Sequence, residues 1–173
     1  YYMRVDVRPV TTIPVGKKLP DYRFGETAYE YLDKMVALCK DNDVELMLIK
    51  APTIYPYWYD EWDEQIIDYA KQHGLVYLNF LDRLAETGID FQTDTYDTGL
   101  HMNLSGAEKL SRYIGPILRE QYNLQDRRAD SALSRIWQEK TSFYNEMIAA
   151  QQEELARYGY LKSLGARPPE TSD

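Results

Sequence analysis

Residues 44–50 read VELMLIK, a short and nearly continuous apolar run that decides the fold. At this length the run is typical of a strand buried on both faces of a parallel sheet. The segment APTIYPYWY at 51–59 follows it and predicts a loop rich in proline and aromatic residues. A second apolar run, LVYLNF at 75–80, predicts the neighbouring strand. Ligands bind at the carboxyl ends of parallel strands, so the loop at 51–59 is expected to lie at the ligand-binding edge.

Apolar residues at helical spacing predict two helices around these strands, one over 26–42 and one that ends at Gly74. The residues that mark them are Tyr29, Leu32, Val36, Cys39, Trp62, Ile66, Tyr69 and His73. This order of helix, strand, helix and strand is typical of α/β folds with right-handed crossovers. A further short strand is expected near YMRVDV at 2–7. Such a sheet still has few strands, so we expect others upstream of Tyr1.

Two more helices are expected in the C-terminal part. Ser105 and Glu108 fit an S-x-x-E capping box that starts the first of them. A longer amphipathic helix is expected over about 130–158, with Gly159 at its end. The apolar stripe of this helix either packs back on the α/β layer or pairs with a partner helix.

Composition excludes several classes of protein. With 44% hydrophobic and 28% charged residues, the chain is expected to be globular. A net charge of −8 argues against a general nucleic-acid binder. The single Cys39 excludes a disulfide within the chain and a cysteine-based metal cluster. Because the only histidines, His73 and His101, lie far apart, neither a metal site nor a cofactor is expected.

The candidate for chemistry is His101, in the stretch DTYDTGLHMNLSGAEKLS at 94–111. Histidine suits proton transfer near neutral pH when a carboxylate fixes one ring nitrogen and the other faces a nucleophile. Asp97 lies four residues upstream, and a turn through residues 98–100 would bring it back to the imidazole. Residue types alone leave open whether this is a catalytic pair or a surface histidine with unrelated aspartates.

The stretch DTYDTGLHMNLSGAEKLSRYIG resembles the C-terminal catalytic block of SGNH/GDSL-type hydrolases, and in particular SGNH-like proteins of Gram-positive gut bacteria. VELMLIKAPT with its aromatic loop and the tail WQEKTSFYNEMIAAQQEELARYGYLKS also resemble that group, so the resemblance covers about 26–164. It implies a flavodoxin-like three-layer α/β/α fold and ester hydrolysis or acyl transfer through a serine. His101 would be the general base and Asp97 its orienting acid. The usual spacing is Asp-x-x-His, but position −3 is Thr98 here, so Asp94 is the alternative acid.

The resemblance also implies groups that the chain does not contain. The nucleophile of the family sits in a Gly-Asp-Ser-type block after the first strand, and every serine here follows His101. The Gly-x-Asn-Asp block that supplies oxyanion donors is likewise absent. We therefore expect the chain to be the C-terminal part of an SGNH-type esterase or O-acyltransferase, acting on an acylated glycan or similar ester and inactive alone. By analogy, the protein is expected to be extracytoplasmic and anchored to a membrane through a missing N-terminal segment.

Three more residues are candidates for substrate binding: Lys50, Trp58 and Asn103. Each has an ordinary alternative, as a strand-end charge, a packing residue and a helix cap, respectively. The alternative function is a non-catalytic glycan-binding or scaffold domain with an SGNH-like fold that uses the aromatic loop. Three regions are expected: an α/β domain over 1–124, a helical extension over 125–164 and a disordered tail over 165–173.

Overall fold

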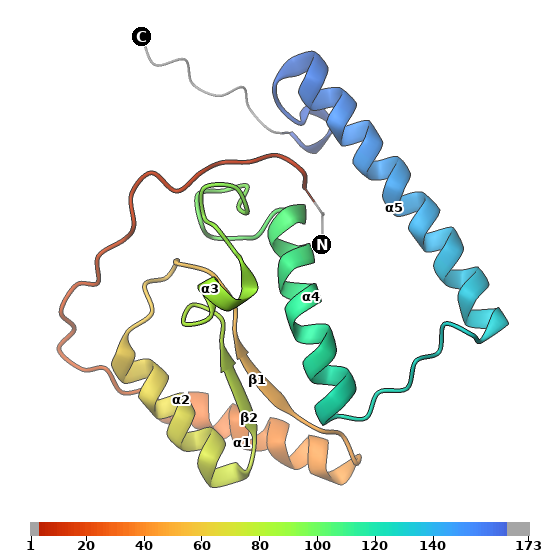
Figure 1. Cartoon of the computed structure of the whole chain (residues 1–173). Helices are drawn as coiled ribbons and strands as arrows, with labels where there is room; N and C mark the ends of the chain where they lie inside the picture. The colour runs from red at the N-terminus through yellow and green to blue at the C-terminus, as the bar shows by residue number, and fades with distance from the viewer. Residues whose placement is uncertain (1–3, 166–173) are drawn as a thin grey trace.

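A computed structural model describes residues 4–165, most of which form helices around a small sheet (Figure 1). The elements in chain order are α1 (Glu26–Asp41), β1 (Met47–Lys50), α2 (Asp60–His73), β2 (Val76–Asn79), α3 (Leu84–Thr87), α4 (Leu104–Gln121), α5 (Ser131–Tyr158) and the 3-10 helix η1 (Lys162–Leu164). The protein is thus of mixed α/β class. The tail expected beyond 165 lies outside the described residues.

The two expected strands form a parallel pair. Met47 of β1 is opposite Val76 of β2, and the register continues to Lys50 opposite Asn79. The prediction of two neighbouring parallel strands is therefore confirmed. The prediction that β1 is buried on both faces is wrong, because Ile49 is 48% exposed. With two strands in the described part of the chain, β1 has a neighbour on one side only.

The helices α1 and α2 lie where the apolar spacing predicts them. Val36 is the buried residue of α1, and Tyr69 and Ala70 are those of α2. Gly74 ends α2 with a φ of +67°, in the left-handed conformation that glycine adopts without a steric cost. The hydroxyl of Tyr69 donates to Asp33 at 2.8 Å, which ties α2 to α1.

The N-terminal segment is extended but forms no strand among residues 4–25, so the prediction of a strand near 2–7 is wrong for the described part of that range. Two of its amides pair instead with the loop before α4: Arg8 N donates to Thr95 O at 2.9 Å and Val10 N to Phe91 O at 3.0 Å. These isolated bonds hold the segment across the molecule without making a ladder.

The core lies where the end of β2 meets the loop before α4. Phe80 is completely buried and meets Tyr113 of α4 edge to face, with ring centroids 6.0 Å apart. Phe80 N donates to Lys50 O at 3.0 Å, which joins the ends of the two strands. This packing places the carboxyl ends of both strands beside the start of α4 (Figure 1).

The cap of α4 differs from the predicted capping box. Asn103, not Ser105, is the N-cap residue, and its side-chain oxygen accepts from Gly106 N at 3.1 Å. The expectation that Asn103 caps this helix is thus confirmed, and the one based on Ser105 is wrong. Asparagine is among the strongest N-cap residues, so the helix begins two residues earlier than the S-x-x-E pattern indicates.

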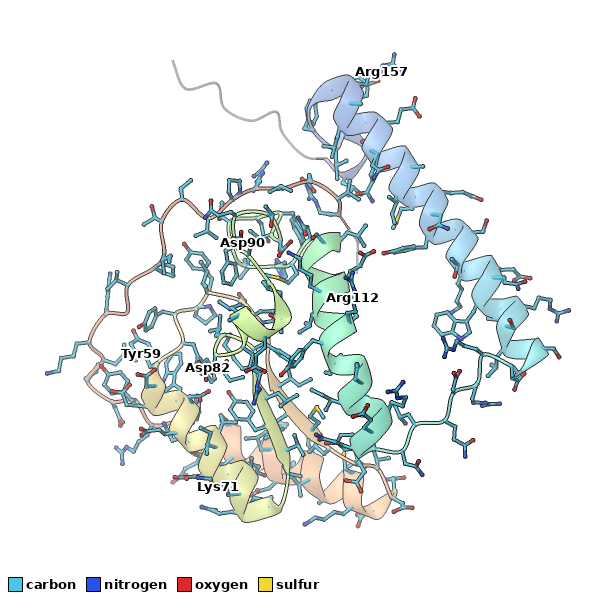
Figure 2. All side chains as sticks on the ribbon, in the orientation of Figure 1. Tyr59, Lys71, Asp82, Asp90, Arg112 and Arg157 are labelled. Atoms are coloured by element: carbon cyan, nitrogen blue, oxygen red, sulfur yellow. The ribbon has the colours of Figure 1, made fainter. Side chains whose placement is uncertain are left out.

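The long helix α5 has the predicted extent and ends at Gly159, which has a φ of +75°. Its packing differs from the expectation that it lies back on the α/β layer. Gln151, in its C-terminal half, is buried and accepts from Val5 N at 3.0 Å, and Tyr144 near its middle donates to Glu108 of α4 at 3.2 Å. Trp137 and Phe143 of its N-terminal half are 64% and 71% exposed. Figure 2 shows side chains on all sides of this half, some of them toward the segment that connects α4 to α5.

Candidate functional site

The loop before α4 is a compact structure built around buried Thr95. Its hydroxyl accepts from Gly99 N at 2.8 Å and from Asp97 N at 3.4 Å, and an antiparallel bridge joins Thr95 to Met102. Thr98 and Gly99 both have positive φ values, +62° and +99°. Two successive residues of this kind turn the chain sharply, so the segment after Thr98 folds back over Asp97.

This turn places His101 against Asp97. The imidazole Nδ1 lies 2.6 Å from Asp97 Oδ2, and the backbone N–H of His101 donates to Asp97 Oδ1 at 2.7 Å. Both carboxylate oxygens therefore contact the same residue. A carboxylate that accepts from Nδ1 favours the tautomer with a proton on that nitrogen and leaves Nε2 as the basic atom.

A second contact fixes the plane of the ring. Tyr96 stacks on the His101 imidazole, with ring centroids 5.7 Å apart and an angle of 6° between the planes. The guanidinium of Arg4 lies 4.7 Å from the centre of the Tyr96 ring. Arg4 is itself held by two hydrogen bonds to Asp6, at 2.9 and 2.6 Å. The contact of Arg4 with Tyr96 and that of Tyr96 with His101 thus link the N-terminal segment to the candidate base.

Asp94, the alternative acid, has other partners. It is completely buried and accepts from Lys109 Nζ at 2.6 Å and from Asp90 N at 2.7 Å. Burial acts to raise the pKa of Asp94, but the hydrogen bonds from Lys109, Asp90 N and Ser105 outweigh it and hold that pKa below its usual value. The structure therefore places Asp97 beside His101, while Asp94 holds α4 to the loop.

His101 lines a cavity of about 950 Å³. The walls come from four parts of the chain: the N-terminal segment at Arg4, the loop after β1, the stretch from Tyr96 to Ala107, and Ser163 with Leu164 of η1. Most of the lining is apolar, with Leu100, Met102 and Leu104 close to His101 in sequence. A site of this size and lining suits a small organic ligand.

The three residues expected to bind substrate are engaged in other contacts. Lys50 Nζ donates to the carbonyls of Ala51 and Thr53 at 2.9 and 3.0 Å, and its pKa is lowered mainly by burial. Trp58 Nε1 donates to Asp63 at 3.0 Å. Neither residue is among those that line the His101 cavity, which the loop after β1 reaches through Ala51, Pro52, Thr53 and Tyr55.

Asn103 does lie at the cavity, yet it is only 2% exposed. Besides capping α4, its amide nitrogen donates to Asp6 O at 3.2 Å and to Thr93 O at 2.8 Å. Three protein partners thus hold this side chain. The geometry supports its ordinary role, which is to fix the loop to α4.

Arg4, Tyr96 and Ser163 lie at the cavity and were not predicted there. Tyr96 directly precedes Asp97 in sequence, and this proximity is the signal from which its place at the cavity could have been predicted. Arg4 and Ser163 lie far from His101 in the chain, and no local pattern connects them to it. The Ser163 hydroxyl donates to Glu154 at 3.0 Å.

Comparison with known proteins gives no match to a family model, to a curated protein or to a solved structure.

The chemistry of the site therefore rests on its geometry. A histidine whose Nδ1 is held by a carboxylate can accept a proton at Nε2. Within residues 4–165, no serine hydroxyl bonds to His101, and none lies at a turn from a strand into a helix. Among the same residues, no group of three or more His, Cys, Asp and Glu side chains is arranged to hold a metal ion. No helix in this part of the chain is both long and apolar enough to cross a membrane.

Proposed function

We propose that the chain supplies the acid–base half of an SGNH-type serine esterase or O-acyltransferase site. His101 is the general base and Asp97 the residue that orients it. The observation that carries the proposal is the double contact of Asp97 with Nδ1 and with the backbone N–H of His101. An aspartate in this position holds the ring and stabilises the imidazolium that forms when the base takes a proton.

The turn at Thr98 and Gly99 supports this role for Asp97. In the family that the sequence resembles, the acid lies three residues before the histidine, whereas Asp97 lies four before it. The positive φ values of Thr98 and Gly99 accommodate the additional residue, because they fold the chain back within the loop. The same reasoning favours Asp97 over Asp94, whose carboxylate contacts Lys109.

The proposal includes a larger fold. A parallel sheet of two strands with helices before and after each strand is compatible with part of a flavodoxin-like three-layer α/β/α domain. The nucleophile and the oxyanion donors would come from another segment of the same protein. The proposed substrate is an acylated glycan or a similar ester, and the apolar lining of the cavity suits an acyl group. An extracytoplasmic location is part of the same proposal.

Nuclear magnetic resonance of the histidine ring tests the acid–base pair directly. In the unaltered chain, ¹⁵N shifts should show His101 as the tautomer protonated at Nδ1, with that proton shifted far downfield by the contact with Asp97. Asp97→Ala should abolish the downfield signal and mix the tautomers. Asp68→Ala, at an exposed position on α2, is the matched control. An unchanged ring spectrum in Asp97→Ala would remove Asp97 from the site.

A serine-reactive fluorophosphonate probe tests the absence of a nucleophile. We expect no labelling of this chain, because Ser163 donates to Glu154 and lacks contact with a histidine. Labelling of any serine that depends on His101 would mean that the chain carries a complete site. In a longer protein with ester turnover, His101→Ala should lower kcat/KM by about a thousandfold or more.

The alternative, a glycan-binding domain without catalysis, makes a different prediction. Binding would then survive His101→Ala and fail when the aromatic loop is altered. The contact of Trp58 with Asp63 makes Trp58 a structural residue, so the exposed Tyr57 is the better position to alter in that loop.

A further inference from the structure

The outer edge of β1 carries unpaired backbone groups. Phe80 N donates to Lys50 O, so the carbonyl of Lys50 points toward β2. The backbone groups of successive strand residues point to alternate sides, so those of Met47 and Ile49 point to the opposite edge. In the part of the chain that the structure describes, no other strand pairs with this edge. The N–H and C=O groups of these two residues are thus available to a further strand.

Edge strands in other proteins are protected by being very short, by charged residues, by proline or a bulge, or by an element that covers them. The strand β1 is short and ends with Lys50, but it contains neither proline nor a bulge. Met47–Ile49 are all apolar, and the register with β2 runs without a bulge. Ile49 in the strand and Val44 shortly before it are 48% and 55% exposed. The edge is therefore suited to pairing.

One flank of α1 is apolar and exposed. Tyr31, Met35 and Leu38 follow one another at helical spacing and are 62%, 44% and 64% exposed. Asp33, on another side of the helix, bonds to Tyr69 of α2, so the exposed flank is turned away from α2. Because α2 leads from β1 to β2 and contacts β2, whereas α1 leads into β1, this flank lies on the side of the open edge.

We propose that an extended apolar protein segment pairs with the outer edge of β1 as a third, parallel strand, and that the elements connected to it cover Tyr31, Met35 and Leu38. The parallel direction follows from the apolar helix flank, because parallel strands are buried by helices on their faces. The further statement that this partner supplies the nucleophile and the oxyanion donors rests on the proposed function. The carboxyl end of a parallel strand would emerge beside Ala51 and Pro52, which line the His101 cavity.

A strand peptide is the probe for this surface. The peptide copies residues 74–81, GLVYLNFL, with two lysines added at each end, because this sequence already pairs in parallel with β1. In titrations followed by amide resonances of the whole chain, the largest shifts should occur at Met47 and Ile49. Their amides should also exchange with solvent more slowly once the peptide is bound. Shifts at other surfaces, or none, would overturn the proposal.

Two surface variants test the part played by α1. The probe for this test is a longer peptide that copies residues 60–81, so that a helix precedes the strand. Met35→Glu combined with Leu38→Glu should weaken binding of this longer peptide at least about tenfold, because two apolar contacts with its helix are lost. Phe143→Glu makes the same kind of change at an exposed position on α5 and should have no effect. Equal effects of the two variants would contradict a role for the α1 flank.

Two further measurements complete the test. The first asks whether a second copy of the chain occupies the edge, and the second distinguishes this proposal from the proposed function. Sedimentation of the chain alone should show a monomer. A dimer that Ile49→Lys dissociates would make a second copy the occupant and overturn the proposal. His101→Ala should leave peptide binding unchanged, since the edge lies outside the acid–base pair. A failure of the histidine experiment with intact peptide binding would therefore refute the proposed function and leave the strand-docking surface in place.

Discussion

At the scale of single residues, the position of His101 depends on Thr95. This buried hydroxyl contacts the amides of both Asp97 and Gly99, so it fixes the start and the middle of the turn that brings Asp97 to the imidazole. His101 itself is 57% exposed on its side chain. A base that is open to solvent on one side and held by a carboxylate on the other is free to meet a substrate without losing its orientation.

Gly99 gives the first prediction. A Cβ at this position would lie 2.6 Å from the Ile54 side chain, and the φ of +99° is strained for any residue with a side chain. Gly99→Ala should lower the free energy of unfolding by about 1–3 kcal/mol, measured by urea denaturation. Gly25→Ala is the control, because Gly25 has an ordinary φ of −67° and no tertiary contact at the position of the new Cβ, so stability should change by less than about 0.5 kcal/mol. Equal stability of the two variants would contradict the conformation of the turn.

Asp94 gives a prediction on pH. Its folded pKa lies below the usual value, so its stabilising effect is complete above the unfolded pKa, about 3.9, and is lost as the pH falls through the folded pKa. Asp94→Asn should therefore cost about 2 kcal/mol at pH 7 and much less near pH 3. Unfolding by urea at both pH values measures the difference. Asp68→Asn, at an exposed ion pair, should change stability little at either pH, and a cost for Asp94→Asn that is independent of pH would contradict the assignment.

At the scale of elements, α4 connects the candidate site to the core. Its N-cap residue Asn103 follows His101 by two positions, and its Lys109 bonds to Asp94 within the same loop. Gly106 allows this approach, since a Cβ there would lie 2.6 Å from the Asp94 carbonyl. Polar contacts from the cap and from Lys109 therefore hold the start of α4 to the loop.

The cap of α4 gives the third prediction. Asn103→Ala removes the bond to Gly106 N and leaves the carbonyls of Asp6 and Thr93 without their donor, so it should cost about 2 kcal/mol. Ser111→Ala, inside the same helix, should cost less than half as much, because its exposed hydroxyl donates to the carbonyl of Ala107 and does not cap the helix. Denaturation of the two variants under the same conditions compares them. A cost for Asn103→Ala no larger than that for Ser111→Ala would contradict the role of Asn103 as the cap.

The order and approximate bounds of the main helices and both strands could be predicted, because apolar periodicity and the glycines at helix ends are local signals. The cap of α4 could not be chosen from the sequence alone, because Asn103 and Ser105 are both good cap residues and the packing against Asp94 decides between them. The pairing of His101 with Asp97 was proposed from their spacing. The positive φ values that make this spacing work belong to the folded loop.

At the scale of the whole molecule, the attachment of α5 was beyond prediction. A periodic apolar stripe shows which face of a helix is expected to be buried, but not which element packs against it. Gln151, Tyr144 and the completely buried Leu161 that follows the helix attach α5 to the rest of the protein, while its first turns lie apart from α4 (Figure 1). Ser163 reaches the cavity through this arrangement, and Arg4 reaches it through long-range contacts with Leu104 and Tyr96, so neither was predicted there.

The difference between the two ends of α5 gives the last prediction. Leu161→Ala should cost about 2–5 kcal/mol, because it opens space at a completely buried position. Trp137→Ser, at a position 64% exposed, should change stability by less than about 0.5 kcal/mol. Thermal and urea unfolding of both variants test this contrast. A large decrease in the free energy of unfolding for Trp137→Ser would mean that the N-terminal half of α5 is packed in solution.

The bond between Val5 and Gln151 joins residues 146 positions apart, so it bears on the timing of folding during synthesis. Contacts this distant form late, because the chain between them must first be made and closed into a loop. On the ribosome, Val5 stays without its partner Gln151 until α5 has emerged. The wall that Ser163 adds to the cavity is therefore among the last parts of the protein to be assembled.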